Sequence, residues 1–330
     1  MLRSETATSP ERLRAALAGL RRYQTAERPP HPPAMPAAVR AGRAVLRDYG
    51  GEGAPVVFVP SLINPPDVLD LAEGRSLLRW LSTQGVRPLL VDWGSPAPEE
   101  RETGIAGHVE SLLLPLLRGL GEPVALAGYC LGGTMALAAA ARLPVRSLAL
   151  IAAPWKFSGF PGQARSDIAD LWQQVKPVAE ALGLLPMEAL QLGFWRLDAA
   201  KTIRKFEDFG SLPDGDPRVD AFVALEDWAN DGPPLTLAAG RDLLEGMFGA
   251  DITGRGEWIV SGSAVDPATL DCPVLDIVST RDRIVPAASA TGLGERMELD
   301  LGHVGMIVGS RGREALWQPL AHWLSQPRKR

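Results

Sequence analysis

Cysteine and histidine are scarce in this chain, and basic residues do not outnumber acidic ones. Its 330 residues include two cysteines and four histidines, and the net charge is −5. Two cysteines are too few for a disulfide framework, which favours a reducing compartment. The scattered cysteines and histidines show no metal-ligand spacing, and no Gly-x-x-x-x-Gly-Lys phosphate loop is present. We therefore expect no metal ion, no cofactor and, without a basic face, no nucleic-acid partner.

Long apolar runs are also missing. A membrane-spanning helix needs roughly 18 consecutive apolar residues. The longest apolar stretch, near residues 136–151, is interrupted by Arg142 and Arg146. The first residues do not resemble a signal peptide, because Arg3 and Glu5 are followed by polar residues rather than by an apolar core. The sequence therefore predicts a cytoplasmic protein with no membrane span.

Two parts of the chain, residues 43–154 and 266–330, alternate apolar runs with helical segments. This alternation predicts an α/β core, in which helices cover both faces of a mostly parallel sheet. Residues 155–265 break the pattern and hold five of the nine tryptophans, among helices separated by Gly and Pro clusters. We expect this region to be an inserted helical cap. Residues 1–42 are predicted to form a helix at 10–24 followed by an extended, proline-rich linker.

The core elements can be placed from their apolar patterns. Short apolar runs bounded by turn residues are typical of buried parallel strands, and longer amphipathic runs are typical of helices. Strands are expected at residues 43–48, 54–60, 88–92, 124–129, 147–152, 273–279 and 296–300. Helices are expected at residues 77–84, 108–119 and 313–324.

The most informative segment is residues 128–132, with the sequence Gly-Tyr-Cys-Leu-Gly. An apolar run precedes it and a run of small residues follows, which indicates a strand, a sharp turn and a helix. A nucleophile elbow has this organisation, and its glycines let neighbouring backbone pack closely. Cys130 occupies the position where serine is usual. The alternative is a small residue buried at a strand end, which is common for free cysteine.

Two later segments supply the partners that a nucleophile needs. Asp282 follows the apolar run at 274–278, and His303 lies farther along the chain in a Leu-Gly-His-Val-Gly segment. The order nucleophile, acid, histidine is that of the α/β-hydrolase fold. We expect His303 to accept the proton of Cys130, and Asp282 to orient the imidazole and stabilise its charged form.

Two backbone N–H groups are needed to stabilise an oxyanion. One is predicted to be that of Leu131, directly after the nucleophile. The other is predicted to come from the loop after the strand at 54–60, near Ser61 or Leu62. A thiol that attacks a thioester exchanges one thioester for another at little net cost, which favours acyl transfer, although cysteine hydrolases also exist.

The remaining candidates have ordinary structural explanations. His108 is expected on the surface of a helix. His322, in the last helix, is expected to be structural, and Cys272 is expected to pack at the start of a strand.

Several segments together resemble the polyhydroxyalkanoate synthase family. The elbow, residues 128–134, resembles the cysteine lipase box of this family. Further similar segments are residues 59–64, 69–71, 76–81, 91–93, 282–286 and 302–303. The resemblance covers about residues 55 to 310 and is strongest at the elbow. The chain departs from the family where Pro60-Ser61-Leu62-Ile63-Asn64 replaces the usual Pro-Pro-Trp-Ile-Asn, and in the cap.

The resemblance implies an α/β-hydrolase fold and a granule-associated enzyme that polymerises 3-hydroxyacyl-CoA. Cys130 would carry the growing polyester as a thioester, and His303, assisted by Asp282, would activate Cys130 and the incoming hydroxyl. CoA thioesters would be substrates, not cofactors. The resemblance also implies a partner, either a second synthase subunit or a second copy of the chain. Two alternatives to a synthase remain: a thioesterase or esterase with the same triad, and a non-catalytic granule protein.

Overall fold

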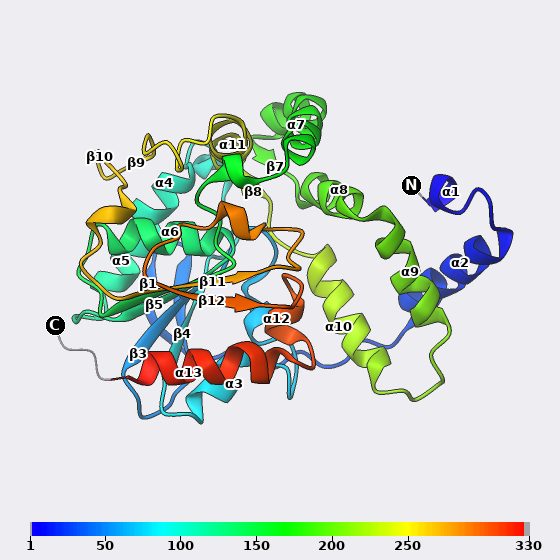
Figure 1. Ribbon diagram of the computed structural model, residues 1–330, viewed down its shortest axis with the longest axis horizontal. Coiled ribbons are helices and arrows are strands. Elements are labelled where there is room, and N and C mark those ends of the chain that lie inside the picture. The colour runs from blue at the N-terminus through cyan, green and yellow to red at the C-terminus, as the bar shows by residue number, and fades with distance from the viewer. Residues whose placement is uncertain (1, 327–330) are drawn as a thin grey trace.

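A mostly parallel sheet forms the centre of the computed structural model, which describes residues 2–326 apart from the side chains of residues 196 and 197 (Figure 1). The strand order is β1-β2-β4-β3-β5-β6-β11-β12. β2 pairs antiparallel with both β1 and β4, and all other neighbours are parallel. The strands are β1 Ala37–Ala41, β2 Ala44–Asp48, β3 Pro55–Val59, β4 Arg87–Asp92, β5 Ala125–Tyr129, β6 Ser147–Ile151, β11 Val274–Ser279 and β12 Glu295–Leu299.

Helices cover both faces of this sheet, so the predicted α/β class is confirmed. They are α3 Leu77–Ser82, α4 Ile105–His108, α5 Leu114–Arg118, α6 Leu131–Ala140, α12 Gly305–Val308 and α13 Gln318–Ser325. Alternate residues of β3 face opposite sides: Val57 and Val59 join one apolar cluster with α4, α5 and α6, while Val56 and Phe58 join the other with α3, α12 and α13. In Figure 1, α5 and α6 lie on one side of the sheet, and α3 and α13 lie on the other.

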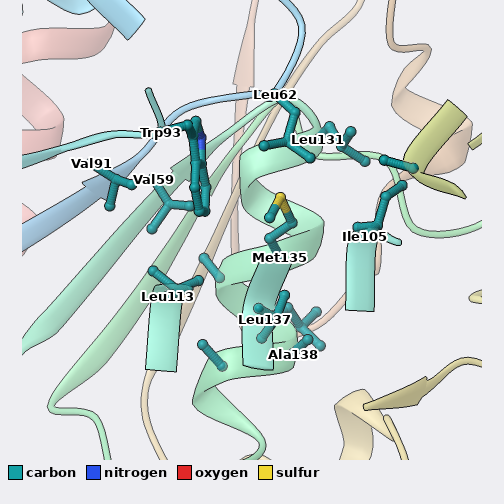
Figure 2. Close-up of a cluster of buried hydrophobic side chains, with 14 of the residues drawn as sticks. Val59, Leu62, Val91, Trp93, Ile105, Leu113, Leu131, Met135, Leu137 and Ala138 are labelled. Carbon is teal, nitrogen blue, oxygen red and sulfur yellow. The ribbon is translucent and has the colours of Figure 1, made fainter. Parts of the chain in front are cut away.

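The central strands are buried along their whole length. Every residue of β5 and β6 is buried, which explains their continuous apolar sequences. α6 is apolar all round, and its residues from Leu131 to Ala139 are buried. Figure 2 shows Met135, Leu137 and Ala138 of this helix packed among side chains from the sheet and from the segment 105–113.

All seven strands predicted from the sequence are present, each within one residue of its predicted ends. The prediction missed β1, which lies inside the segment expected to be a linker. β1 is a half-exposed edge strand, so it lacks the apolar run that marks a buried one. It joins β2 through a two-residue turn at Gly42, whose φ of 54° suits glycine.

The predicted helices are also present, with π-helical turns in two of them. The helix expected at 108–119 begins at Ile105 and runs through α4, a π turn at Val109–Leu113, and α5. The last helix has a π turn at Arg313–Trp317 before α13. Pro115 and Pro319 follow these turns, and each lacks the N–H that a regular α-helical ladder requires. Short 3-10 turns occur at Pro66–Leu69, Pro98–Glu100, Phe157–Gly159, Pro267–Thr269 and Ala287–Ser289.

Residues 155–265 are largely helical and lie beside the sheet (Figure 1). Their helices are α7 Gly162–Leu182, α8 Met187–Leu197, α9 Ala199–Gly210, α10 Arg218–Asn230 and α11 Leu237–Arg241, the last followed by a π turn at Asp242–Gly249. Two short antiparallel pairs also occur: β7 Leu184–Leu185 pairs with β8 Leu235–Thr236, and β9 Ile259–Val260 forms a hairpin with β10 Ser263–Ala264.

The N-terminal helices pack against this helical region rather than against the sheet. They are α1 Leu2–Glu5 and α2 Pro10–Thr25, and the Ser9 side chain caps α2 by accepting from the N–H of Arg12 (3.3 Å). α2 crosses α9 so closely that a Cβ on Gly19 would lie 1.8 Å from the carbonyl oxygen of Phe206. Within residues 2–326, no helix combines the length and the apolar character that crossing a membrane would require.

Candidate active site

Cys130 lies at the turn between β5 and α6, at the carboxyl end of the parallel strands. Its φ of 56° and ψ of −133° are unusual for a residue with a side chain and cost on the order of 1–3 kcal/mol. The backbone N–H of Cys130 donates to the carbonyl of Ile151 at the end of β6 (3.0 Å). The thiol is half-buried and is not part of a disulfide. The predicted strand, turn and helix are therefore present, with the cysteine at the strained position.

Three glycines allow the backbone to pack closely around this turn. A Cβ on Gly128 would lie 2.3 Å from the Cα of Gly133, and a Cβ on Gly132 would lie 2.1 Å from the carbonyl oxygen of Val59. The first turn of α6 therefore touches the end of β3. This contact places Leu131 beside Leu62 in the loop after β3, as Figure 2 shows.

His303 and Asp282 form a buried pair in the loops after β12 and β11. Nδ1 of His303 donates to Oδ2 of Asp282 (2.6 Å), and the two side chains are 5% and 0% exposed. The other carboxylate oxygen, Oδ1, accepts the backbone N–H groups of Ile284 (2.8 Å) and Val285 (2.9 Å). Asp282 is thus held from two sides, and its bond to Nδ1 leaves Nε2 of His303 for a further partner.

Cys130 is that further partner. Burial alone would lower the pKa of His303, but the charges of Asp282 and Cys130, and hydrogen bonds with both, raise it from 6.5 to about 10. The structure therefore brings the three predicted side chains together around one imidazole. This arrangement can activate the sulfur as a nucleophile and can take up and return a proton at His303.

Tyr129 is a site residue that the sequence analysis did not single out. Its ring stacks on the imidazole of His303, with centroids 4.9 Å apart and planes at 25°. Its hydroxyl donates to the carbonyl of His303 (3.2 Å), and burial, followed by the charges of Cys130 and Asp282, raises the pKa of Tyr129 well above 10. Tyr129 therefore stays neutral and holds the histidine loop. Its position directly before Cys130 was the available signal.

The two residues predicted to supply oxyanion donors lie at the same end of the sheet. Leu131 is the first residue of α6, where an N–H group has no intrahelical acceptor. Leu62 follows Ser61, whose hydroxyl accepts the N–H of Ile63 (3.0 Å) and shapes the loop. Their assignment as oxyanion donors stays a prediction.

The expectation for His108 was wrong. This residue is 2% exposed, because it lies on the same helical face as the buried Ile105, Val109 and Leu112. Its Nδ1 donates to the carbonyl of Gly104 (2.8 Å), while Nε2 accepts from Arg43 (2.8 Å). Burial, assisted by the charge of Arg43, lowers the pKa of His108 to about 4, so it is neutral and structural.

Cys272 is half-buried directly before β11, where it packs against the apolar core, and His322 contacts Gln326 near the end of the last helix. In the described part of the chain, no group of three or more His, Cys, Asp or Glu side chains is arranged to hold a metal ion.

The raised pKa of His303 predicts a pH-dependent contribution to stability. Protonated His303 is favoured in the folded state, so its contribution is complete below pH 6.5 and is lost as the pH rises through about 10. Asp282→Asn removes one cause of the raised pKa, so the pKa of His303 should fall and the stability change across this window should shrink. Imidazole NMR titration and urea unfolding at several pH values measure both effects. An unchanged titration in the variant would contradict the assignment of Asp282.

The close packing at Gly132 predicts a large effect of one methyl group. In Gly132→Ala, the new Cβ would lie 2.1 Å from the Val59 carbonyl, so α6 or the β3 loop must shift. We expect a loss of about 1–3 kcal/mol in the free energy of unfolding, measured by urea denaturation. Gly162→Ala is the control, because a Cβ there meets nothing within 4 Å. Equal stability of the two variants would show that the elbow is not tightly packed.

Comparison with known proteins bears out the predicted resemblance. The chain is 29% identical over 292 residues to the poly(3-hydroxyalkanoate) polymerase subunit PhaC of Haloferax mediterranei, covering 82% of this chain and 58% of the relative. The protein of the same name from Synechocystis sp. is 28% identical over 294 residues, covering 82% of this chain and 78% of the relative. The chain thus spans little more than half the length of the Haloferax protein.

Solved structures agree on the fold at low sequence identity. An epoxide hydrolase from Bacillus megaterium has a TM-score of 0.55 and 15% identity, with 86% of this chain and 99% of that chain covered. A thermophilic esterase from Thermogutta terrifontis has a TM-score of 0.50 and 17% identity, with 91% and 100% covered. The sequence model of the alpha/beta hydrolase family matches residues 56–316, from β3 to the final helices. The chain therefore belongs to the α/β hydrolase family.

Proposed function

We propose that this protein is an acyltransferase that builds polyhydroxyalkanoate from 3-hydroxyacyl-CoA through an acyl thioester on Cys130. The observation that carries the proposal is a cysteine at the elbow, facing the buried pair of His303 and Asp282. The relatives named poly(3-hydroxyalkanoate) polymerase support the substrate class. A thiol suits this chemistry, because thioester exchange with CoA conserves the reactivity of the acyl group.

The proposed reaction has two acyl transfers. In the first, the thiol proton of Cys130 passes to His303, the sulfur attacks the thioester carbonyl, the bond to the CoA sulfur breaks, and the departing CoA takes that proton from His303. In the second, His303 accepts the proton of a 3-hydroxyl group, whose oxygen forms an ester bond while the bond to Cys130 breaks. The N–H groups of Leu131 and Leu62 would stabilise the oxyanion in both steps. Asp282 would stabilise the imidazolium each time His303 is protonated.

The proposed setting of this activity is the surface of a polyester granule in the cytoplasm. Several relatives are named as polymerase subunits. We therefore propose that the chain acts with a second subunit or as a dimer.

One product analysis distinguishes the proposed function from its alternatives. The protein is incubated with 3-hydroxybutyryl-CoA, and intact mass, released CoA, free acid and extracted polymer are measured. We expect an acyl adduct on Cys130 and polymer, both of which Cys130→Ala should abolish, with at least a ~10³-fold loss of CoA release. Cys272→Ala is the matched control and should keep both.

The other outcomes identify the alternatives. Release of CoA with free 3-hydroxybutyrate and no polymer would indicate a thioesterase. Cys130 is only half-buried, so water could reach its acyl thioester. No adduct with any acyl-CoA, and no effect of Cys130→Ala on granule binding, would indicate a non-catalytic protein.

A further inference from the structure

The loop that carries Leu62 is fastened at both ends by tryptophan side chains. At its start, the indole Nε1 of Trp93 donates to the carbonyl of Pro60 (3.1 Å). At its end, the indole Nε1 of Trp228 donates to the carbonyl of Pro65 (2.8 Å). Trp93 follows β4 in the core, whereas Trp228 belongs to α10 of the inserted helical region. The loop therefore joins the core to that region.

Asn64, between these two anchors, contacts the same helix. The last carbonyl groups of a helix have no intrahelical donor and need other partners. The side-chain Nδ2 of Asn64 supplies one at the carboxyl end of α10. The acceptors are the carbonyl oxygens of Trp228 (3.3 Å), Ala229 (3.2 Å) and Asp231 (3.2 Å). Asn64 thus caps a helix that lies more than 150 residues away in sequence.

The backbone at this contact is suited to close approach. Asn64 has a φ of 64°, a left-handed conformation that asparagine tolerates better than most residues. Gly232, just after α10, has a φ of 142°, and a Cβ there would lie 3.1 Å from the Cα of Asn64. The two chain segments are therefore in direct contact, in addition to their hydrogen bonds.

α10 also has contacts with the N-terminal segment and with α9. Asp227 accepts from the hydroxyl of Tyr23 (2.6 Å) and pairs with Arg28 (3.0 Å), both from the N-terminal segment. The neighbouring Glu226 is 4% exposed and pairs with Lys205 of α9 (2.7 Å). The helix end that binds Asn64 is thus fixed relative to α2 and α9.

We propose that Asn64 and Trp228 are positioning residues, which set the orientation of the Leu62 N–H by fastening its loop to α10. This proposal rests on the proposed function, in which Leu62 stabilises the oxyanion. Trp93 holds the end of the loop that lies next to the core. Asn64 and Trp228 hold the other end, so the position of that end depends on the position of α10. The inserted helical region therefore controls the oxyanion site directly.

Two substitutions test this assignment. Trp228→Phe keeps an aromatic ring and removes the indole N–H. Asn64→Asp keeps the size of the side chain and the tolerance of a positive φ, but it replaces the donor by a carboxylate that faces carbonyl oxygens. Trp172→Phe is the matched control, because its indole N–H bonds Glu245 (2.6 Å) within the same helical region, away from the loop.

The measurements separate oxyanion stabilisation from general integrity. In single-turnover acylation of Cys130 by 3-hydroxybutyryl-CoA, we expect both variants to lose about 10- to 100-fold in maximal rate, with an unchanged half-saturating concentration. Alkylation of Cys130 by iodoacetamide forms no oxyanion and should keep its wild-type rate. Hydrogen exchange in residues 61–65 should accelerate in both variants, and Trp172→Phe should match the wild type in all three.

Three results would overturn the proposal. These are wild-type acylation rates in both variants, a parallel loss of acylation and alkylation, or unchanged hydrogen exchange in the loop. Failure of the proposed function has a different signature, since the wild-type protein would then either form no acyl adduct on Cys130 or release free acid without polymer. Hydrogen exchange would still show whether α10 fastens the loop.

Discussion

The absence of side chains at Gly128, Gly132 and Gly133 is the constraint on which the site depends. It lets the first turn of α6 lie directly on the ends of β3 and β6, closer than any Cβ would permit. Cys130 can then hold its unfavourable φ and ψ, because the packed backbone on either side fixes the turn. The sulfur, the Leu131 N–H and the β3 loop all take their positions from this contact.

A second constraint is the free-energy cost of burying the charged carboxylate of Asp282 beside His303. An ionised carboxylate out of water is costly unless its oxygens have partners. Asp282 meets this requirement with two backbone N–H groups and the imidazole of His303. The cost of burial is thereby offset, and the same hydrogen bonds fix the tautomer and the direction of the ring. The stacked ring of Tyr129 also restricts rotation of the His303 imidazole away from the elbow.

The sequence predicts the parts of this fold that depend on local pattern. Buried strands are continuous apolar runs, so seven of them could be placed to within a residue, and the elbow and the two later site residues follow from strand ends. β1 was missed because an exposed edge strand needs no apolar run. His108 was misplaced because its polar residue type outweighed its position on the apolar helical face of Ile105, Val109 and Leu112. Tyr129 and Asn64 could not be assigned, since their roles arise from contacts between segments far apart in sequence.

The groups around Cys130 do not by themselves distinguish transfer to an alcohol from transfer to water. His303 can accept a proton from either, and Asp282 stabilises the imidazolium in both cases. We expect the choice to depend on the loop after β3 and on the inserted helical region to which Asn64 binds. These are the segments in which the chain departs from the synthase pattern, with Ser61 and Leu62 where the family usually has proline and tryptophan. Because Asn64 joins that loop to α10, a change in either segment alters its contact with the other, and we expect the identity of the acyl acceptor to depend on both together.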